Sequence, residues 1–476
     1  MVTAFKRSVA FALLAAVSAW AAPAAPPQDA KTLLSNASKA MGADNLKTIQ
    51  YSGTGTEFAY GQAYNPDSPW PPFADKSYTR TIDYETPAWR VDRVLDEVPP
   101  DRRGGGLPPG PTQNVVVGAN TPWATQVDLW MTPYGFLREA MKSEVTVSSK
   151  SMGGKKYSVA TFTAPNKAKF NGYFDAQNML DRVETWIDDP MLGDLLIEAN
   201  YSGYRDFDGV QFPAKIVLKR GGFPTLDLSV SHVQRNAPTN IQGNPAGAPQ
   251  NPPTTSMKLA DGVFAILPAY ASLAVDFKDY IVIVEGPQSD ERASAIIAEA
   301  KKDIPNKPIK YVVNTHNHFD HSGGLRTFIA EGATIITYQG NKGYFEKIFS
   351  LPHTLNPDRQ SAAKKKISIE TMGDKKVLTD GNREIDLYRS LGSNHNYGLI
   401  MAYLPKEKIL VEADGFNPPA QANAPPPAVI NPNNTNLLEN INRLNLDVET
   451  IIPIHYPPDG RKVTMAELMR AVHKGS

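Results

Sequence analysis

The 476-residue sequence contains no cysteine, so neither disulfide bonds nor thiolate metal ligands contribute to its structure. It also has no formal net charge, because 49 basic residues balance 49 acidic ones. This balance gives no indication of a nucleic acid or an anionic membrane surface as a partner. Histidine is scarce, with eight residues in the whole chain. The length exceeds that of a typical single domain, and we expect two domains.

The N-terminus lacks an apolar run long enough to cross a membrane, which requires about 20 residues. Instead, Lys6 and Arg7 precede a short apolar run and an Ala-Trp-Ala sequence, a pattern typical of a secretory signal peptide. We therefore expect residues 1–21 to be a signal peptide, the mature chain to have no stable membrane anchor, and the location to be periplasmic or secreted. Without disulfides, an exported chain depends on core size and bound metal for its stability.

The sequence predicts a mainly antiparallel β domain over residues 22–235, after one short helix over 29–45. Segments such as "KSYTRTIDYE" and "RVETWIDD" alternate apolar and polar residues and end at Gly, Pro or Asp. The order of these segments loosely resembles the half-barrel of periplasmic lipoprotein-carrier and sorting proteins. Two Pro/Gly-rich insertions, 64–75 and 98–111, are interpreted as surface loops rather than as a lip that contacts substrate or the second domain.

A segment rich in Pro, Asn and Gly (236–256) predicts an interdomain linker. The second domain is expected over residues 257–476. Its first part alternates strand-like runs with a helix-like segment, "DERASAIIAEAKKDI", and this alternation predicts a layered unit of helices and sheets.

A cluster of metal-binding residue types lies in "THNHFDHSGG", residues 315–324. Neutral imidazole and carboxylate are good zinc ligands. His316 and His318 are two residues apart and point to the same side of an extended segment, and Asp320 and His321 follow directly. The preceding "IKYVVNT" predicts a buried strand, and Ser322 is expected to cap the helix that follows. One loop can thus serve two metal ions; the alternative is a polar turn that happens to be rich in histidine.

The HxHxDH pattern, placed after an apolar strand and before "SGG", resembles the metallo-β-lactamase superfamily over roughly residues 255–476. The resemblance implies an α+β protein in which a four-layered αββα domain follows the mainly antiparallel one. It also implies two zinc ions per chain. By the same resemblance, the expected zinc ligands are His316, His318 and His395 for one ion, Asp320, His321 and His455 for the other, and Asp414 as the bridge, whereas His232, His353 and His473 are not ligands.

The function implied by the resemblance is an exported binuclear zinc hydrolase. A metal-bound hydroxide would attack an ester, lactone, thioester or amide carbonyl, and Asp320 would orient that hydroxide and move its proton. The complete HxHxDH pattern favours hydrolysis over the redox chemistry of the superfamily's iron enzymes. The neutral side chains expected beside the ligands as oxyanion donors are Asn394, Asn396, Tyr397 and Tyr456.

Two other functions remain open from the sequence. One is a periplasmic protein that binds a lipid or hydrophobic ligand and carries an accessory metal domain. The other is a β-lactamase whose zinc ligands are only His and Asp, although an aspartate at the bridging position, Asp414, argues against it. The substrate is expected to be a small molecule, and the uncharged segment 415–436 indicates an uncharged or hydrophobic one. That segment is either an active-site lid or a solvated connection.

Overall fold

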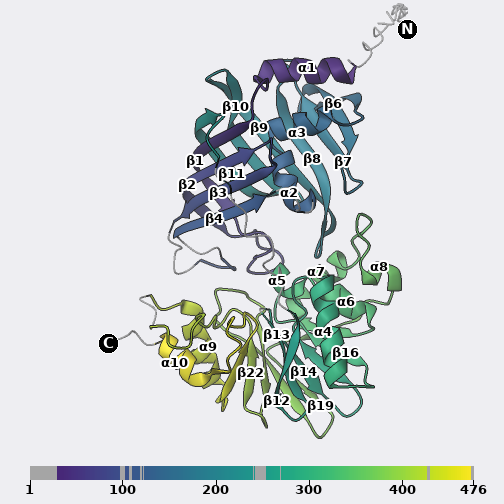
Figure 1. Ribbon diagram of the computed structural model, residues 1–476. Helices are drawn as coiled ribbons and strands as arrows, with labels where there is room; N and C mark the ends of the chain where they lie inside the picture. Colours follow the sequence, from purple (N-terminus) through teal and green to yellow (C-terminus); the bar gives the residue numbers. More distant parts are fainter. Residues whose placement is uncertain are drawn as a thin grey trace, which may run out of the picture.

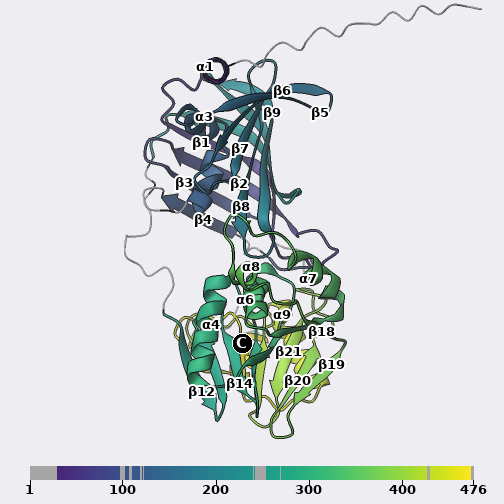
Figure 2. The same cartoon turned by 90° about the vertical axis from the view of Figure 1, so that its right-hand side faces the viewer.

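The structure is a computed structural model that describes residues 29–96, 102–106, 110–117, 121, 123–239, 241, 253–268, 270–425 and 429–472. The expected signal peptide, most of the expected linker and His473 lie outside these residues. Two bodies are stacked one above the other, the N-terminal one above the C-terminal one in Figures 1 and 2.

The N-terminal domain is built on one eleven-stranded sheet in the order β4-β3-β2-β1-β11-β10-β9-β8-β7-β6-β5. Every neighbouring pair is antiparallel. Along β9, the alternate residues Leu195, Ile197, Ala199 and Tyr201 are buried, as a strand with one face on the core requires. The strands are β1 (Thr48–Phe58), β2 (Pro72–Asp83), β3 (Ala88–Leu95), β4 (Gly110–Val117), β5 (Thr146–Met152), β6 (Lys155–Thr163), β7 (Lys169–Phe174), β8 (Leu180–Asp189), β9 (Gly193–Phe207), β10 (Val210–Arg220) and β11 (Phe223–Arg235).

Three helices cover one face of this sheet: α1 (Ala30–Met41), α2 (Trp123–Trp130) and α3 (Pro133–Met141). Helix α1 coincides with the helix expected over 29–45, and the Asp29 side chain caps it by accepting a hydrogen bond from the Thr32 amide. Helices α2 and α3 were not anticipated from the sequence. Each is only two or three turns long, and α3 depends on burying Tyr134, Phe136 and Leu137 rather than on its own propensity.

The C-terminal domain contains two sheets packed face to face. The first has the order β12-β13-β14-β15-β16-β17-β18 and the second has the order β19-β20-β21-β22-β23-β24. The strands are β12 (Thr255–Ala260), β13 (Val263–Leu267), β14 (Ser272–Asp276), β15 (Ile281–Val284), β16 (Ile309–Val313), β17 (Thr334–Tyr338), β18 (Ile369–Met372), β19 (Lys375–Thr379), β20 (Glu384–Arg389), β21 (Ile400–Leu404), β22 (Ile409–Glu412), β23 (Thr450–Pro453) and β24 (Val463–Thr464).

Helices cover the outer face of each sheet, and three apolar clusters fill the spaces between the four layers. The observed layering confirms the expected αββα arrangement and the α+β class. On the first sheet lie α4 (Asp290–Asp303), α5 (Phe319–Ser322), α6 (Leu325–Ala330), the short 3-10 helix η1 (Gln339–Asn341), α7 (Lys342–Ile348) and α8 (Arg359–Ala363), and on the second lie α9 (Pro432–Arg443) and α10 (Met465–Val472).

No helix in the described part of the chain has the length and apolarity needed to cross a membrane. In the described part of the segment after Asp414, the Pro419 carbonyl accepts a 2.8 Å hydrogen bond from the guanidinium of Arg461, which lies in the loop between β23 and β24.

The two domains meet through loops that the sequence had indicated as solvated. Within the 64–75 insertion, the Tyr64 carbonyl accepts a hydrogen bond from the Tyr397 amide at 2.9 Å. From the 98–111 insertion, the Gly104 amide donates to the Asn394 carbonyl at 2.8 Å. The interpretation of both insertions as plain surface loops was therefore wrong for the described parts, which contact the second domain.

A third contact joins the turn between β8 and β9 to the loop before α8. The Asp194 carboxylate accepts hydrogen bonds from the Thr354 amide at 2.9 and 3.0 Å, from the Thr354 hydroxyl at 2.5 Å and from the Leu355 amide at 3.0 Å. Burial alone would raise the pKa of Asp194, but the hydrogen bonds from Thr354 and Leu355 outweigh it and hold the pKa below its ordinary value.

We expect Asp194→Ala to weaken the domain contact by about 1 to 2 kcal/mol, the size of a few partly exposed hydrogen bonds to a charged group. Because the pKa of Asp194 is lower in the folded state, its contribution is present above the unfolded pKa near 4 and is lost as the pH falls through the folded pKa. Thermal unfolding at pH 7 and pH 3 checks this. The exposed Glu144→Ala is the control, and equal melting temperatures for both variants at pH 7 would contradict the prediction.

Candidate metal centre

The histidine loop between β16 and α6 is held in shape by Asn314. The Asn314 side-chain amide donates to the His316 carbonyl at 2.7 Å and to the Ser322 hydroxyl at 3.1 Å, and that hydroxyl donates to the His316 carbonyl at 3.0 Å. Ser322 therefore does not cap a helix, as the sequence had suggested; it is the last residue of α5 and closes the loop on itself. Residues 314–322 form one tight turn at the end of a buried strand.

The structure brings all seven residues expected as ligands into two adjacent groups. Each group offers ligand atoms that lie within 4.8 Å of one another. The His316 and His321 rings, one from each group, lie 4.4 Å apart between centroids. The first group comprises His316, His318, His395 and Asp414, and the second comprises Asp320, His321 and His455.

The Asp414 carboxylate lies between the two groups. Its Oδ2 is 3.5 Å from His316 Nε2, 3.3 Å from His395 Nε2 and 2.9 Å from His321 Nε2, and its Oδ1 is 3.0 Å from His455 Nε2. Two of these imidazoles belong to the first group and two to the second. The Asp414 carboxylate thus links the two groups of candidate ligands.

The donor atoms of this cluster fit a metal because they are buried and lack other partners. Apart from their contacts with one another, five donor atoms are buried without a hydrogen-bond partner in the described part of the chain: His316 Nε2, His318 Nδ1, His321 Nε2, His395 Nε2 and Asp414 Oδ2. Buried polar atoms rarely remain unsatisfied. Their convergence on two neighbouring points, with nitrogen and carboxylate oxygen as the available donors, suits a divalent metal such as zinc.

The other ring nitrogen of each histidine in the loop is engaged by the protein. His318 Nε2 donates to the Ala63 carbonyl at 3.0 Å. His321 Nδ1 lies 3.4 Å from Glu285 Oε2, and His316 Nδ1 lies 3.1 Å from the Thr315 hydroxyl, which donates to the same Glu285 oxygen at 2.5 Å. These contacts select the tautomer that leaves Nε2 of His316 and His321, and Nδ1 of His318, directed at the cluster.

Two buried glutamates hold the ligands in place, and the sequence reasoning missed both. Glu285, fully buried at the end of β15, is the common acceptor for Thr315 and His321. Glu412 accepts hydrogen bonds from the Gly415 and Phe416 amides at 2.9 and 3.1 Å, and so shapes the turn that carries Asp414 at a φ of 58°. The available sequence signal was an acidic residue within or directly after an apolar strand, at "IVIVE" and "ILVE".

Asp320 is held by one contact from each domain. Its Oδ1 accepts a hydrogen bond from the Gln62 side-chain amide at 2.8 Å, and its Oδ2 accepts one from the Tyr270 hydroxyl at 3.1 Å. The Tyr270 ring also packs on His455, with centroids 4.7 Å apart. Neither Gln62 nor Tyr270 was among the residues expected from the sequence.

Burial and neighbouring charges shift the pKa values of several residues in the cluster. Burial, together with the neighbouring His395, lowers the pKa of His318 to about 3, and burial lowers the pKa of His316 well below its ordinary value. Burial alone would raise the pKa of Asp414, but His395 and His321 bring it well below its ordinary value. His316 and His318 are therefore neutral, which is the form in which imidazole binds a metal.

The pKa of His321 moves the other way. Burial opposes its charge, yet the nearby carboxylates Asp320 and Asp414 raise its pKa well above the ordinary value. These two carboxylates therefore favour the protonated form of His321 in the chain without metal. A bound cation and this proton compete for the same place, because the nitrogen must be deprotonated to become a ligand.

Two loops of the N-terminal domain lie directly against the loop that carries the metal-cluster histidines. Gly61 has a φ of 76° and its carbonyl accepts a hydrogen bond from the Phe319 amide at 3.2 Å, and a Cβ at Gly61 would lie 2.4 Å from the Phe319 ring. A Cβ at Gly105 would lie 1.9 Å from Gln62 Oε1 and 2.9 Å from His318 Cε1. Glycine is required at both positions because the two backbones approach the metal loop closely.

The side chains that the sequence suggested as oxyanion donors have different surroundings. The Asn396 amide donates to the Asn317 side chain at 2.9 Å and to the Ala63 carbonyl at 3.3 Å, so it supports the loop and is not free to meet a substrate. Tyr397 is 47% exposed and packs on Tyr64. The Tyr456 hydroxyl is buried and has no hydrogen-bond partner among the described residues.

The histidines expected not to be ligands lie elsewhere, as far as the structure describes them. His232 is exposed on β11, and His353 is buried at the domain contact, 3.9 Å from the Asp188 carboxylate. Neither belongs to a metal group among the described residues.

We expect Glu285→Ala to lower metal affinity and activity by about 10- to 100-fold, the usual effect of removing a partner that orients a metal ligand. Glu285→Gln should have a smaller effect, since its amide oxygen still accepts hydrogen bonds from Thr315 and His321. Chelator competition measures the affinity. Ser272→Ala, which removes a 2.9 Å hydrogen bond to the Glu285 carbonyl without touching a ligand, is the control. Wild-type affinity in Glu285→Ala would refute the orienting role.

Comparison with known proteins agrees with the observed fold of the C-terminal domain. Residues 284–455 match the family model described as the metallo-beta-lactamase superfamily. The C-terminal half of this chain is therefore a metallo-β-lactamase-fold domain with a candidate His/Asp metal cluster. No match was found among curated protein sequences.

Solved structures with similarity to the chain include a metallo-beta-lactamase from Pontibacter korlensis, at 16% identity and a TM-score of 0.35, with 46% of this chain and 97% of that chain covered. Another is a metallo-beta-lactamase from Hirschia baltica, at 20% identity and a TM-score of 0.34, with 46% of this chain and 97% of that chain covered.

Proposed function

We propose that this protein is an exported hydrolase with two zinc ions, which cleaves an ester, lactone, thioester or amide bond in a small, uncharged or hydrophobic molecule. The observation that carries the proposal is the placement of the Asp414 carboxylate within 3.5 Å of four imidazole nitrogens drawn from both groups. A site with neutral donors on both sides of one carboxylate suits a pair of divalent cations. His316, His318, His395 and Asp414 would hold one ion, and Asp320, His321, His455 and the shared Asp414 the other.

Zinc in such a site lowers the pKa of a bound water towards 7 and polarises a substrate carbonyl. The chain supplies the positioning. Asp320, whose pKa is lowered chiefly by His321 against the effect of burial, is a carboxylate that can accept a hydrogen bond from a water molecule and take its proton. Tyr270 and Gln62 fix the orientation of that carboxylate.

The exposed edge of the cluster indicates where a substrate would enter. The side chains of Asp320 and His455 are 26% and 27% exposed, whereas those of His316 and His321 are fully buried. A substrate carbonyl therefore reaches the cluster on the side of Asp320 and His455. No side-chain nucleophile is needed for this reaction, which agrees with a chain that has no cysteine.

The test begins with the chain lacking residues 1–21. Elemental analysis is expected to find about two zinc ions per chain. The protein should hydrolyse at least one member of a panel of esters, lactones, thioesters and β-lactams, lose that activity to a chelator and regain it on addition of zinc. Failure to bind metal after reconstitution, or iron as the main metal without any hydrolysis, would overturn the proposal. Fractionation of the producing cells tests export.

A further inference from the structure

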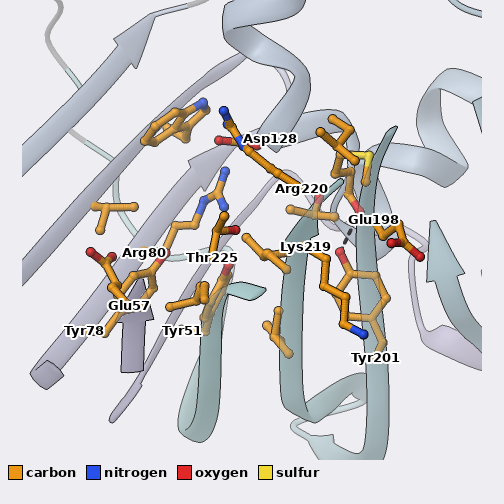
Figure 3. A pocket seen from close by; sticks show the side chains of 18 of the residues that line it. Tyr51, Glu57, Tyr78, Arg80, Asp128, Glu198, Tyr201, Lys219, Arg220 and Thr225 are labelled. Carbon is orange, nitrogen blue, oxygen red and sulfur yellow. Dashed lines mark hydrogen bonds between the residues drawn. The ribbon is translucent and has the colours of Figure 1, made fainter. Parts of the chain in front are cut away.

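The curved sheet of the N-terminal domain contains a cavity of about 300 Å3, and none of the seven residues of the metal cluster lines it. Strands β1 and β2 contribute one side of the cavity and β9 and β10 the other, as Figure 3 shows for its labelled side chains, and β3 adds further residues to the wall. The volume falls at the lower end of the range of small-molecule sites. Much of the wall is apolar or aromatic, with Tyr51, Tyr78, Trp89, Tyr201, Phe212 and Ile216 among its residues.

Of the four cationic side chains that line the cavity, Arg80 is the buried one. Arg80 is 5% exposed, and its Nε and Nη2 atoms are buried without a hydrogen-bond partner in the part of the chain that the structure describes. Its guanidinium carbon lies 4.8 Å from the centroid of the Trp89 ring. Arginine stays charged under all ordinary conditions. Arg80 donates a hydrogen bond to the Tyr51 hydroxyl and interacts electrostatically with Asp128, but its Nε and Nη2 groups have no acceptor among the described residues. Buried N–H donors of a charged group that remain unsatisfied are costly, so these two groups favour an anionic acceptor.

The acidic residues in the wall do not supply that anion. Glu57 and Glu198 are each engaged in an ion pair with another arginine. Asp128 lines the same cavity and attracts the Arg80 charge, but no direct ion pair joins these two side chains among the described residues. Overall, four cationic and three anionic side chains line the cavity, which leaves an excess of one positive charge.

We propose that this cavity binds a carboxylate with an apolar body, such as a medium-chain fatty acid. The carboxylate would accept hydrogen bonds from the Arg80 guanidinium in the paired geometry that guanidinium and carboxylate favour. The apolar body would lie along the aromatic wall formed by Tyr51, Trp89 and Tyr201. This binding site is independent of the metal cluster and of the hydrolysis proposed for it.

The ligand class also refines the hydrophobic-ligand function that the sequence left open. A purely apolar molecule would leave the Nε and Nη2 groups of Arg80 without an acceptor, whereas a carboxylate can accept hydrogen bonds from both. The site is therefore expected to distinguish decanoate from decanol, two molecules that share an apolar chain and differ in charge.

Isothermal titration calorimetry on the full chain without residues 1–21 tests this directly. Decanoate is expected to bind the wild-type protein, and Arg80→Met is expected to weaken its binding by about 10- to 100-fold, as loss of a charge-assisted pair requires. Decanol binding should change less than about threefold, because the methionine side chain keeps the apolar part of the wall. Arg80→Lys keeps the charge but not the paired hydrogen-bond geometry, so its decanoate affinity should lie between those of the wild type and Arg80→Met.

The control is Arg90→Met, which removes an arginine from β3 that pairs with Asp92 and does not line the cavity. It should leave decanoate binding unchanged. Arg80→Met is expected to remain folded, since the methionine fills an apolar and aromatic wall and removes two buried N–H groups that have no acceptor. The proposal is overturned by absence of decanoate binding to the wild type, or by equal decanoate affinity in wild type and a folded Arg80→Met variant.

Discussion

Asp414→Ala is expected to reduce bound zinc from about two ions per chain to one or none. Its hydrolytic activity is expected to fall by more than the 10- to 100-fold loss that is typical when a residue that only orients a metal ligand is removed. The reason is geometric. The Asp414 carboxylate lies within 3.5 Å of imidazoles from both groups of the cluster, so its removal would take a ligand from each of the two proposed ions.

Asp414→Asn is the sharper companion variant. It keeps the size of the side chain and its left-handed turn conformation, but it removes the negative charge that lies among His316, His321, His395 and His455. If the charge is what holds two cations together, the asparagine variant should lose zinc almost as fully as the alanine variant. Asp374→Ala, at a carboxylate of the same domain that is 70% exposed, is the control and should keep both ions. Two zinc ions in folded Asp414→Ala would show that Asp414 is not the bridge.

Gly61→Ala is expected to lower activity and metal affinity by about 10- to 100-fold, although the substitution lies in the N-terminal domain. At a φ of 76°, a Cβ costs about 1 to 2 kcal/mol of backbone strain. The same Cβ would lie 2.4 Å from the Phe319 ring and so push the loop at residues 59–64 away from the metal loop. That movement withdraws the Ala63 carbonyl from His318 and the Gln62 amide from Asp320.

Gly154→Ala separates the two effects. Gly154 has a φ of 78°, close to that of Gly61, and a Cβ there would meet nothing within 4 Å. Both variants should lose similar stability from backbone strain, but only Gly61→Ala should lose metal affinity and activity. Equal activity in the two variants would show that the N-terminal domain does not help to form the metal site.

The extent to which the sequence predicted this protein depends on how far apart the cooperating residues lie. The sequence could predict a group made of His316, His318, Asp320 and His321, because these residues are close neighbours in the chain. A strand followed by a tight turn can direct the side chains of such neighbours to the same place, and this depends only on local structure. His395, Asp414 and His455 lie far along the chain, and their choice depended on resemblance to a family. The structure places all three beside the first loop.

The sequence by itself determined the mainly antiparallel character of the first domain, the alternation of strands and helices in the second, the apolar strand before the histidine loop and the residue types of the metal cluster. These features depend on periodicity and on the chemistry of single side chains. Only the tertiary structure decided that the N-terminal domain helps to form the site. Pro/Gly-rich composition reports that a segment is irregular, but it does not report what that segment lies against. The sequence could not indicate that the Ala63 carbonyl orients His318, because every residue has a backbone carbonyl. Only the packing of the two domains places this particular carbonyl beside the histidine.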